Sequence, residues 1–248
     1  MTNDESFAIE RAAALAAYGR HLAVSFSGRV DECAGVQMCD AKLAWRSRNM
    51  VVPLRPLDDV TCRQLNGRLM DFYGSDRWVL WSTFHLELAQ SGFRLAESHP
   101  VMTRPVANIA EPPSVEGLSI KEVTDDAGVR LFERIRQTAD EHPPPYDATP
   151  GRFFDARVLG NGHRLWLGYI DNHPVATAAA FEHDRMNLIK NVSTAATHRG
   201  RGIGHSMSEH AARSSKERPS LDGAAAAVPM YRNLGFAQTG QVDFWVHT

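Results

Sequence analysis

The stretch "RGRGIG" (residues 199–204) combines two arginines with three glycines. The segment before it, "MNLIKNVST" (186–194), is typical of a strand, and the segment after it lacks Gly and Pro as far as residue 218. A helix start leaves its first amide N–H groups unpaired and carries the positive end of the helix dipole. Glycines let these amides approach a ligand closely. The stretch therefore predicts an anion site for a phosphate or a pyrophosphate.

Two common phosphate-binding motifs do not fit this stretch. The dinucleotide fingerprint needs a third glycine where His205 or Met207 stands, and a P-loop needs a Lys followed by Ser or Thr at its end. The pattern that remains is Arg-x-x-Gly-x-Gly at Arg199, Gly202 and Gly204.

A second motif, "MYRNLGF" (230–236), indicates a short helix that carries Tyr-x-x-Leu-Gly-Phe. Before the glycine stretch, three strands joined by short turns (164–171, 173–184 and 186–194) indicate an antiparallel meander. In this order, the meander, the Arg-x-x-Gly-x-Gly loop and the Tyr motif resemble the GNAT acetyltransferase superfamily. The resemblance covers residues 114–248.

The resemblance implies an N-acetyltransferase with acetyl-coenzyme A as its co-substrate. The acetyl group would pass to a primary amine of a small molecule or a peptide by direct attack on the thioester. Tyr231 matches the family's usual general acid, which protonates the leaving thiolate. The strand before the loop would hold the pantetheine arm, and the loop amides would hold the pyrophosphate. The implied cofactor-binding residues are Val192, Ser193, Thr194, Arg199, Gly200, Arg201, Gly202, Ile203, Gly204 and His205.

The chain departs from the family pattern in two places. Many relatives carry a Glu as general base on the strand before the loop, but strand 186–194 has no carboxylate. The groups that could relay a proton through water instead, each also typical of a solvated surface, are Glu182, His183, Asp184 and Asp222. Ala224 stands near the position where many relatives have an Asn that meets the cofactor. These departures leave a second hypothesis open, a non-catalytic acyl-coenzyme A-binding regulatory module.

The acceptor site is expected at the first helix of the catalytic part (125–142), the proline-rich loop "EHPPPYDATPGRFF" (141–154) and the cleft between the two parts. Aromatic side chains could form an apolar wall there: Tyr146, Phe153, Phe154 and Trp166. Carboxylates could attract a cationic amine: Asp140, Glu141 and Asp147. The acceptor itself is not specified by these residues.

A linker separates the chain into two parts. "ANIAEPPSVEGL" (107–118) has paired prolines and no apolar periodicity, which predicts a domain boundary. Residues 111–248 would be the catalytic GNAT domain. Residues 1–110 resemble the degenerate acetyltransferase-like half of two-part family members, without the Arg-x-x-Gly-x-Gly loop, and should not bind coenzyme A. The expected fold is α/β (α+β), with a mixed, mostly antiparallel sheet flanked by helices in the catalytic part and a smaller α/β half of similar type before it.

Apolar periodicity and turn residues predict the other elements. Helices are expected over residues 5–24, 58–74, 84–93, 125–142, 201–218 and 228–236. Further strands are expected over 49–57, 77–83, 94–106, 118–123, 220–226 and 237–248.

Composition narrows the class of protein. The chain has 248 residues and a formal net charge of −2, which argues against a general nucleic-acid binder. Its beginning is acidic and lacks a long apolar run, so neither a signal peptide nor a membrane span is expected. The three cysteines are spaced for neither a disulfide framework nor a metal site. We therefore expect a cytoplasmic monomer or homodimer without a bound metal.

Overall fold

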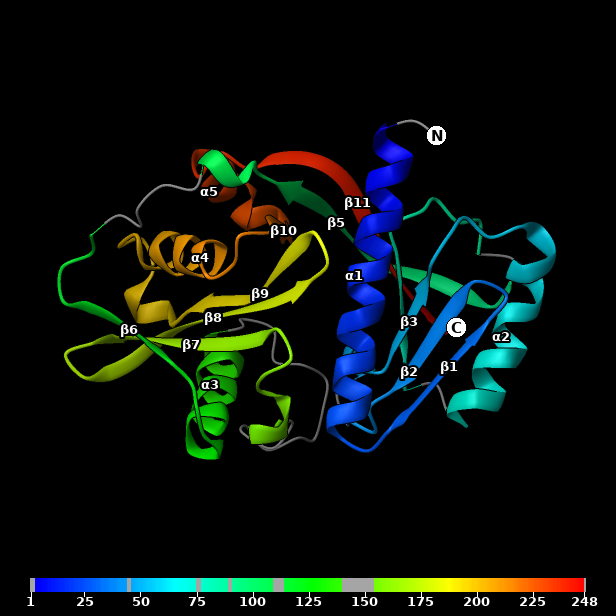
Figure 1. Cartoon of the computed structure of the whole chain (residues 1–248), viewed down its shortest axis with the longest axis horizontal. Helices are drawn as coiled ribbons and strands as arrows, with labels where there is room; N and C mark the ends of the chain where they lie inside the picture. Colours follow the sequence, from blue (N-terminus) through cyan, green and yellow to red (C-terminus); the bar gives the residue numbers. More distant parts are fainter. Residues whose placement is uncertain are drawn as a thin grey trace. The chain divides into compact units, whose positions relative to one another are not determined.

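The structure is a computed structural model that describes residues 3–43, 46–74, 77–88, 91–108, 114–139 and 154–247. The chain divides into two compact units. The first unit consists of Met1–Val101 together with Gln238–Thr248, and the second is Met102–Ala237. Figure 1 labels the elements of both units along the chain.

The first unit is a small mixed sheet with two long helices. Its elements are α1 (Asn3–Ser25), β1 (Arg29–Cys33), β2 (Val36–Asp40), the 3-10 turn η1 (Arg46–Arg48), β3 (Met50–Pro53), α2 (Asp59–Tyr73), β4 (Val79–Ser82), β5 (Phe93–Thr103) and β11 (Ala237–His247). The strand order is β1-β2-β3-β4-β11-β5, in which β3 and β4 run parallel and β1, β2 and β3 pair antiparallel. None of the described helices, including the 23-residue α1, is long and apolar enough to cross a membrane.

The ends of α2 follow from local chemistry. The carboxylate of Asp58 accepts a hydrogen bond from the Thr61 amide at 2.7 Å and caps the start of the helix. Gly74 ends the helix in a left-handed conformation at φ 64°, and its N–H donates to the Met70 carbonyl. The predicted helix and its glycine stop are therefore confirmed.

The helix predicted for residues 84–93 is wrong for the described part of that segment. Phe84, Leu86 and Leu88 are buried and alternate with exposed His85 and Glu87, in a segment that is neither helix nor strand. This period of two belongs to an extended chain, and a helix would have placed its buried side chains three or four residues apart. Residues 89 and 90 lie outside the described residues.

The second unit is built around an antiparallel meander. Its elements are η3 (Val106–Asn108), β6 (Leu118–Glu122), α3 (Asp126–Ala139), η4 (Ala156–Val158), β7 (His163–Ile170), β8 (His173–His183), β9 (Met186–Thr194), η5 (Ala196–His198), α4 (Ile203–Arg213), β10 (Arg218–Asp222), η6 (Ala225–Ala227) and α5 (Val228–Asn233). The strand order is β10-β9-β8-β7-β6. The predicted meander is confirmed, because β7 pairs antiparallel with β8 and β8 with β9.

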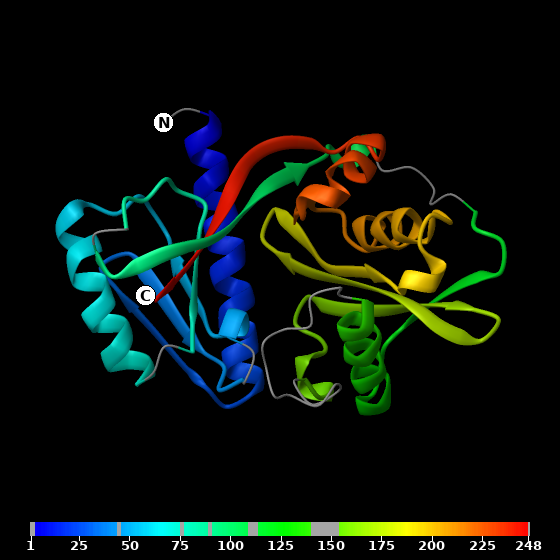
Figure 2. The ribbon, with the colours of Figure 1, turned by 180° about the vertical axis from the view of Figure 1, so that it is seen from behind.

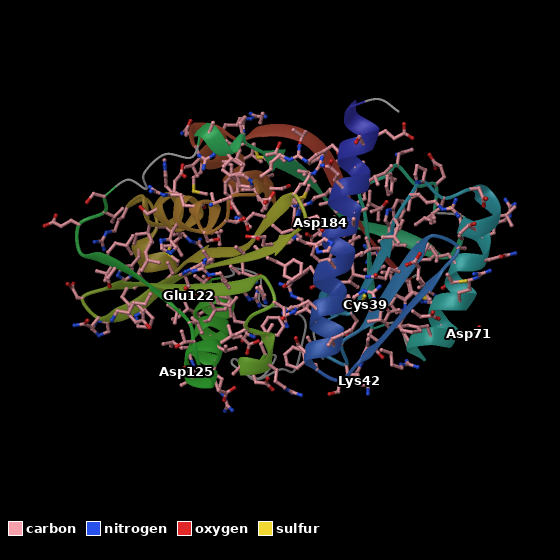
Figure 3. All side chains as sticks on the ribbon, viewed as in Figure 1. Cys39, Lys42, Asp71, Glu122, Asp125 and Asp184 are labelled. Atoms are coloured by element: carbon pink, nitrogen blue, oxygen red, sulfur yellow. The ribbon has the colours of Figure 1, made fainter. Side chains whose placement is uncertain are left out.

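Two helices cover the two faces of this meander. α3 and α4 both pack on β8 and β9, and Figures 1 and 2 show them on opposite sides of the sheet. Asp125, labelled in Figure 3, starts α3 by accepting a hydrogen bond from the Gly128 amide at 2.7 Å. The core beneath α4 and α5 includes Trp166 and Met207, both fully buried.

Helix α4 is shorter than the predicted helix over residues 201–218. It ends at Arg213, and Arg218 is already the first residue of β10. Arg218 pairs with Met186 of β9 in a parallel ladder. Helical periodicity alone missed this stop, because the segment offers neither Gly nor Pro before residue 219.

The two units differ from the predicted boundary at residues 110 and 111. The final strand β11 is part of the first unit over most of its length, because it pairs antiparallel with β4, with Phe244 opposite Trp81. The predicted linker residues 109–113 lie outside the described residues. The observed fold class, a mostly antiparallel mixed sheet flanked by helices, agrees with the prediction.

Candidate functional site

A groove of about 1000 Å³ opens in the second unit between the end of β9, the start of α4 and helix α5. The predicted cofactor-binding residues line it, with the exception of Arg201, and so does Tyr231. The remaining lining residues are Ala139, His198, Ala224, Ala226, Ala227, Pro229, Met230 and Asn233. The structure therefore brings the residues of both sequence motifs to one concave surface.

The groove begins where two parallel strands part. β9 and β10 are paired from Met186 and Arg218 as far as Ile189 and Leu221. Beyond this point β9 continues to Thr194, whereas the chain after β10 turns into η6 and α5. The end of β9 and helix α5 thus form two walls of the same opening.

A β-bulge in β9 sets which side chains face the groove. Between the pairs Ala179–Lys190 and Thr177–Ser193, β9 holds one more residue than β8. Asn191 takes a left-handed conformation at φ 52° there, and its carbonyl accepts a hydrogen bond from the Thr177 hydroxyl at 2.8 Å. Such an extra residue re-aims the side chains that follow it.

The change of face is visible on both sides of the bulge. Before it, Asn187 donates to the Ala211 carbonyl of α4 and Ile189 packs in the core beneath α4. After it, the even-numbered Val192 packs on that core. Thr194 lies near Gly204 of α4, where an added Cβ would meet the Thr194 Oγ1 at 3.5 Å. The bulge therefore directs Val192 and Thr194 to the α4 side.

The start of α4 requires glycine and carries no side-chain cap. Gly200 and Gly202 have positive φ values of 75° and 80°, which residues with a Cβ rarely adopt. Gly202 is the N-cap and has no side chain to accept a hydrogen bond from the first turn. The first amides of a helix have no partner within it. The α4 N-terminus is therefore available to an anion, as the sequence pattern predicts.

The two arginines of the loop have different surroundings. Arg199 donates to the Ala139 carbonyl at 2.5 Å through Nη2 and to the Thr194 carbonyl at 3.3 Å through Nε. It fastens the loop to the ends of α3 and β9. Arg201 is exposed and does not line the groove, so the prediction that it contacts a cofactor has no support in this geometry.

Tyr231 lies in the wall formed by α5. It is 6% exposed, and burial, followed by the nearby charge of Asp222, raises the pKa of its phenol to about 12. A hydrogen bond with the Ser208 side chain of α4 acts in the opposite direction on this pKa. The Ser208 hydroxyl itself donates to the Gly204 carbonyl at 2.7 Å. The phenol is therefore neutral and hydrogen-bonded to α4.

The carboxylates considered as proton relays do not line the groove. None of the described lining residues is Asp or Glu. Asp184, labelled in Figure 3, lies with Glu182 and His183 at the β8–β9 turn, at the opposite end of β9 from Thr194. Asp222 forms an ion pair with Lys190. The turn residues are therefore too far along the strand to serve the groove.

Sequence reasoning missed two polar residues of the groove and placed two aromatic residues wrongly. His198 and Asn233 line the groove, and their only signal was their proximity to the two motifs. Phe154 and Trp166, expected in an acceptor wall, are buried away from the groove lining. The other acceptor candidates, Asp140, Glu141, Tyr146, Asp147 and Phe153, lie outside the described residues.

A known family model matches the part of the chain that forms this site. Residues 161–238 match a family model described as an acetyltransferase (GNAT) domain. The matched segment contains the meander, the glycine loop, α4 and α5. The resemblance predicted from the two motifs is thus confirmed for this segment. Among curated proteins, none is similar enough in sequence to match the chain.

Solved structures share the fold of the chain. A GCN5-related N-acetyltransferase from Kribbella flavida has a TM-score of 0.73 at 17% identity, covering 97% of this chain and 95% of that chain. A functionally unknown conserved protein from Staphylococcus epidermidis has a TM-score of 0.63 at 12% identity, covering 90% and 94%. A GCN5-related N-acetyltransferase-like protein from Streptococcus suis has a TM-score of 0.54 at 12% identity, covering 98% and 100%. These similarities confirm the GNAT fold class.

Proposed function

We propose that the chain is an acetyl-coenzyme A-dependent N-acetyltransferase that acts on a primary amine of a small molecule or a peptide. The observation that carries the proposal is the groove that joins an uncapped helix start, a bulged strand end and Tyr231. An anionic, elongated thioester fits such a surface because its pyrophosphate and its acyl group need contacts at separate ends.

The proposed anion end is the first turn of α4. Its amides and the dipole of the helix favour a pyrophosphate. Gly200, Gly202 and Gly204 leave the backbone accessible, and no described acidic side chain lines the groove to oppose an anion. Arg199 would act mainly by holding the loop in place, since its guanidinium already binds two carbonyls.

The proposed reacting end lies between the end of β9 and Tyr231. Backbone groups of Val192, Ser193 and Thr194 would orient the thioester, and a neutral amine would attack its carbonyl carbon. The C–N bond forms, the C–S bond breaks, and the amine proton passes to solvent. The Tyr231 hydroxyl would donate a hydrogen bond to the leaving sulfur, which takes up a proton from solvent. Holding donor and acceptor together supplies much of the rate gain in such a reaction.

The first unit is proposed to be a degenerate copy of the same design. In each unit a run of antiparallel strands is followed by a parallel pair, β3–β4 in one and β9–β10 in the other, with a helix between the parallel strands. The two helix starts differ in charge. Asp58 caps α2, and its hydrogen bonds with Thr61 hold the pKa of its carboxyl below the usual value. This carboxylate would repel a pyrophosphate.

A non-catalytic acyl-coenzyme A-binding regulatory module is the second candidate. The observation in its favour is that the described lining of the groove contains no carboxylate to act as a general base. This candidate would bind acyl-coenzyme A at the same site as the enzyme but would not transfer the acyl group.

The donor site can be tested by substitution of Gly204. Its φ is not positive, and an added Cβ would meet only Met230 and Thr194 at ordinary contact distance. We expect acetyl-coenzyme A to raise the Tm of the wild type and of Gly204→Gln, but not of Gly204→Glu, because the carboxylate opposes the pyrophosphate. An equal shift in all three proteins would remove the α4 start from the site.

Turnover separates the two candidates. Thiol release from acetyl-coenzyme A is measured with a panel of primary amines and with peptides that carry a free N-terminus. Amine-dependent release by the wild type, lost in Gly204→Glu, supports the enzyme. Tight binding without release for any acceptor supports the regulatory module.

A further inference from the structure

Lys190 and Asp222 form a buried ion pair beside the groove. The Lys190 Nζ lies 2.5 Å from the Asp222 Oδ1, and the two side chains are 5% and 11% exposed. Neither residue lines the groove. The pair is therefore placed to act on the site through the backbone.

The pair lies at the point where β9 and β10 part. The last paired residues of β9 and β10 are Ile189 and Leu221, and Lys190 and Asp222 are the next residue of each strand. Past this point the two strands part and their continuations form the groove walls. The ion pair thus continues the link between β9 and β10 by one residue after the backbone ladder has ended.

The pair occupies the sheet face opposite α4. Ile189 and Leu221 belong to the core beneath α4, and side chains alternate between faces along a strand. Lys190 and Asp222 therefore point to the other face. The bulge at Asn191 follows Lys190 directly, so the residue that starts the change of face is anchored by the pair.

Asp222 also directly precedes the backbone on which the Tyr231 ring packs. A Cβ on Gly223 would lie 3.1 Å from two ring carbons of Tyr231, so the ring packs directly on the backbone that follows Asp222. A shift of Asp222 would move this backbone and with it the phenol. One ion pair consequently anchors the residue before the β9 bulge and the residue before the backbone on which the Tyr231 ring packs.

Stability alone does not explain the pair. Moving two charges from water into a protein interior costs about as much as their attraction returns, and well-packed apolar side chains often stabilise as well. What an ion pair adds is a defined geometry between two backbones. That property matters where the ladder no longer fixes the spacing of the strands.

We propose that Lys190 and Asp222 are positioning residues that set the separation of β9 and β10 at the point where the two strands part, and with it the alignment of the bulged strand against Tyr231. This inference rests on the proposed acetyl transfer for its kinetic part. Neither residue of the pair belongs to the α4 start, so the pair acts on the alignment of the strand and tyrosine walls rather than on the proposed pyrophosphate contacts.

The test compares Lys190→Met, Asp222→Asn and the apolar double variant Lys190→Met/Asp222→Leu with the wild type. The double variant removes both charges of the buried pair and is expected to fold. Matched controls are Lys121→Met and Asp171→Asn, at exposed positions of the same unit. Hydrogen exchange of peptides spanning residues 191–194 and 223–231 is measured together with coenzyme A binding and the kcat of acetyl transfer.

We expect exchange in both peptides to rise about tenfold in the variants, including the double variant, and to stay unchanged in the controls. The kcat should fall about 100-fold, because small misplacements of reacting groups are costly, while the Kd for coenzyme A changes less, because its proposed pyrophosphate contacts at the α4 start are retained. Unchanged exchange in the folded double variant would overturn the inference, as would an unchanged kcat. If the wild type transfers acetyl to no amine, the proposed function fails and the exchange data still decide the positioning role.

Discussion

At the scale of single residues, the environment of Tyr231 limits what its phenol can do. Its pKa is raised to about 12, mainly by burial. A thiol has a reference pKa of about 8.5, so complete proton transfer from this phenol to a thiolate would be uphill by roughly 5 kcal/mol. A hydrogen bond that strengthens as charge develops on sulfur avoids this cost. We therefore expect Tyr231 to stabilise the leaving group mainly as a hydrogen-bond donor.

Tyr231→Phe should lower kcat about 100-fold, at the lower end of the range for the loss of one preorganised hydrogen-bond donor. Acetyl transfer to the best amine of the panel measures this change. Tyr169→Phe, at a half-buried position of strand β7, is the matched control and should keep the wild-type kcat. A kcat of Tyr231→Phe equal to that of the wild type would assign the phenol to packing.

The same substitution gives a pH-dependent stability difference. Because the folded pKa lies above the ordinary value of 10, the phenol stabilises the fold below pH 10 and this advantage disappears as pH rises to about 12. At pH 8 the wild type should exceed Tyr231→Phe by about 1 kcal/mol, through the Ser208 hydrogen bond. By pH 11 the wild type should have lost roughly 1 kcal/mol, so its advantage over Tyr231→Phe largely disappears. Urea unfolding of both proteins at pH 8 and pH 11 measures the difference.

Functional residues in motifs of fixed spacing could be predicted from the sequence. Contacts between residues that are far apart in the chain could not. Gly202, Gly204 and Tyr231 stand in motifs whose chemistry is local. Lys190 and Asp222 are far apart in the chain and meet only because β9 and β10 are neighbours in the sheet. No local pattern indicates such a contact.

At the scale of elements, Arg104 joins the two helices that border the groove. Its guanidinium donates to both carboxylate oxygens of Glu209 on α4, at 2.6 and 2.7 Å, and to the carbonyl of Leu234 at the end of α5. It also lies over the ring of Phe236. Arg104 and Glu209 are 1% and 2% exposed. This buried ion pair therefore helps to fix the relative placement of α4 and α5.

Arg104→Met should reduce the free energy of unfolding by about 3–5 kcal/mol, because the Glu209 carboxylate is left buried without its charge partner. Guanidinium-chloride unfolding measures the loss. The double variant Arg104→Met/Glu209→Met removes both charges and should recover most of it. Arg157→Met breaks an exposed ion pair with Asp155 and should cost less than about 1 kcal/mol. Equal losses in both single variants would contradict this account.

Elements were predictable where one periodicity dominated. The meander strands and α2 were found because β-branched runs, helical spacing and the Gly74 stop agree with each other. The segment from Phe84 to Leu88 was misread because its short apolar run was assigned a helical period, although its burial alternates. The hairpin of β1 and β2 was not predicted, since both strands are short and carry mixed polar residues.

At the scale of the whole chain, the last strand returns to the first unit. β11 pairs with β4, and Val242 is fully buried in it. The sequence-based boundary assigned this segment to the catalytic part, because adjacency along the chain suggests it and the pairing with β4 is non-local. According to the structure, a destabilising substitution in β11 should weaken the first unit. According to the sequence-based boundary, it should weaken the second.

Val242→Ala should destabilise the first unit by about 2 kcal/mol through lost apolar burial and a small cavity. Hydrogen exchange should then accelerate in β4 (Val79–Ser82) and remain unchanged in α4 (Ile203–Arg213). Val60→Ala, at an exposed position of α2, is the control and should change neither. Acceleration confined to α4 would favour the sequence-based boundary.

Because of the bulge at Asn191, the facing of the side chains at the end of β9 depends on the number of residues in this strand more than on their types. Without the bulge, a regular ladder with β8 would continue the alternation of Asn187 and Ile189, so that Ser193 would face α4 in place of Val192 and Thr194. Substitutions at a single wall position change one contact, whereas a one-codon insertion or deletion between the bulge and Thr194 changes the facing of every strand residue after it. Across related chains, insertions and deletions should therefore avoid this segment even where its amino acids vary.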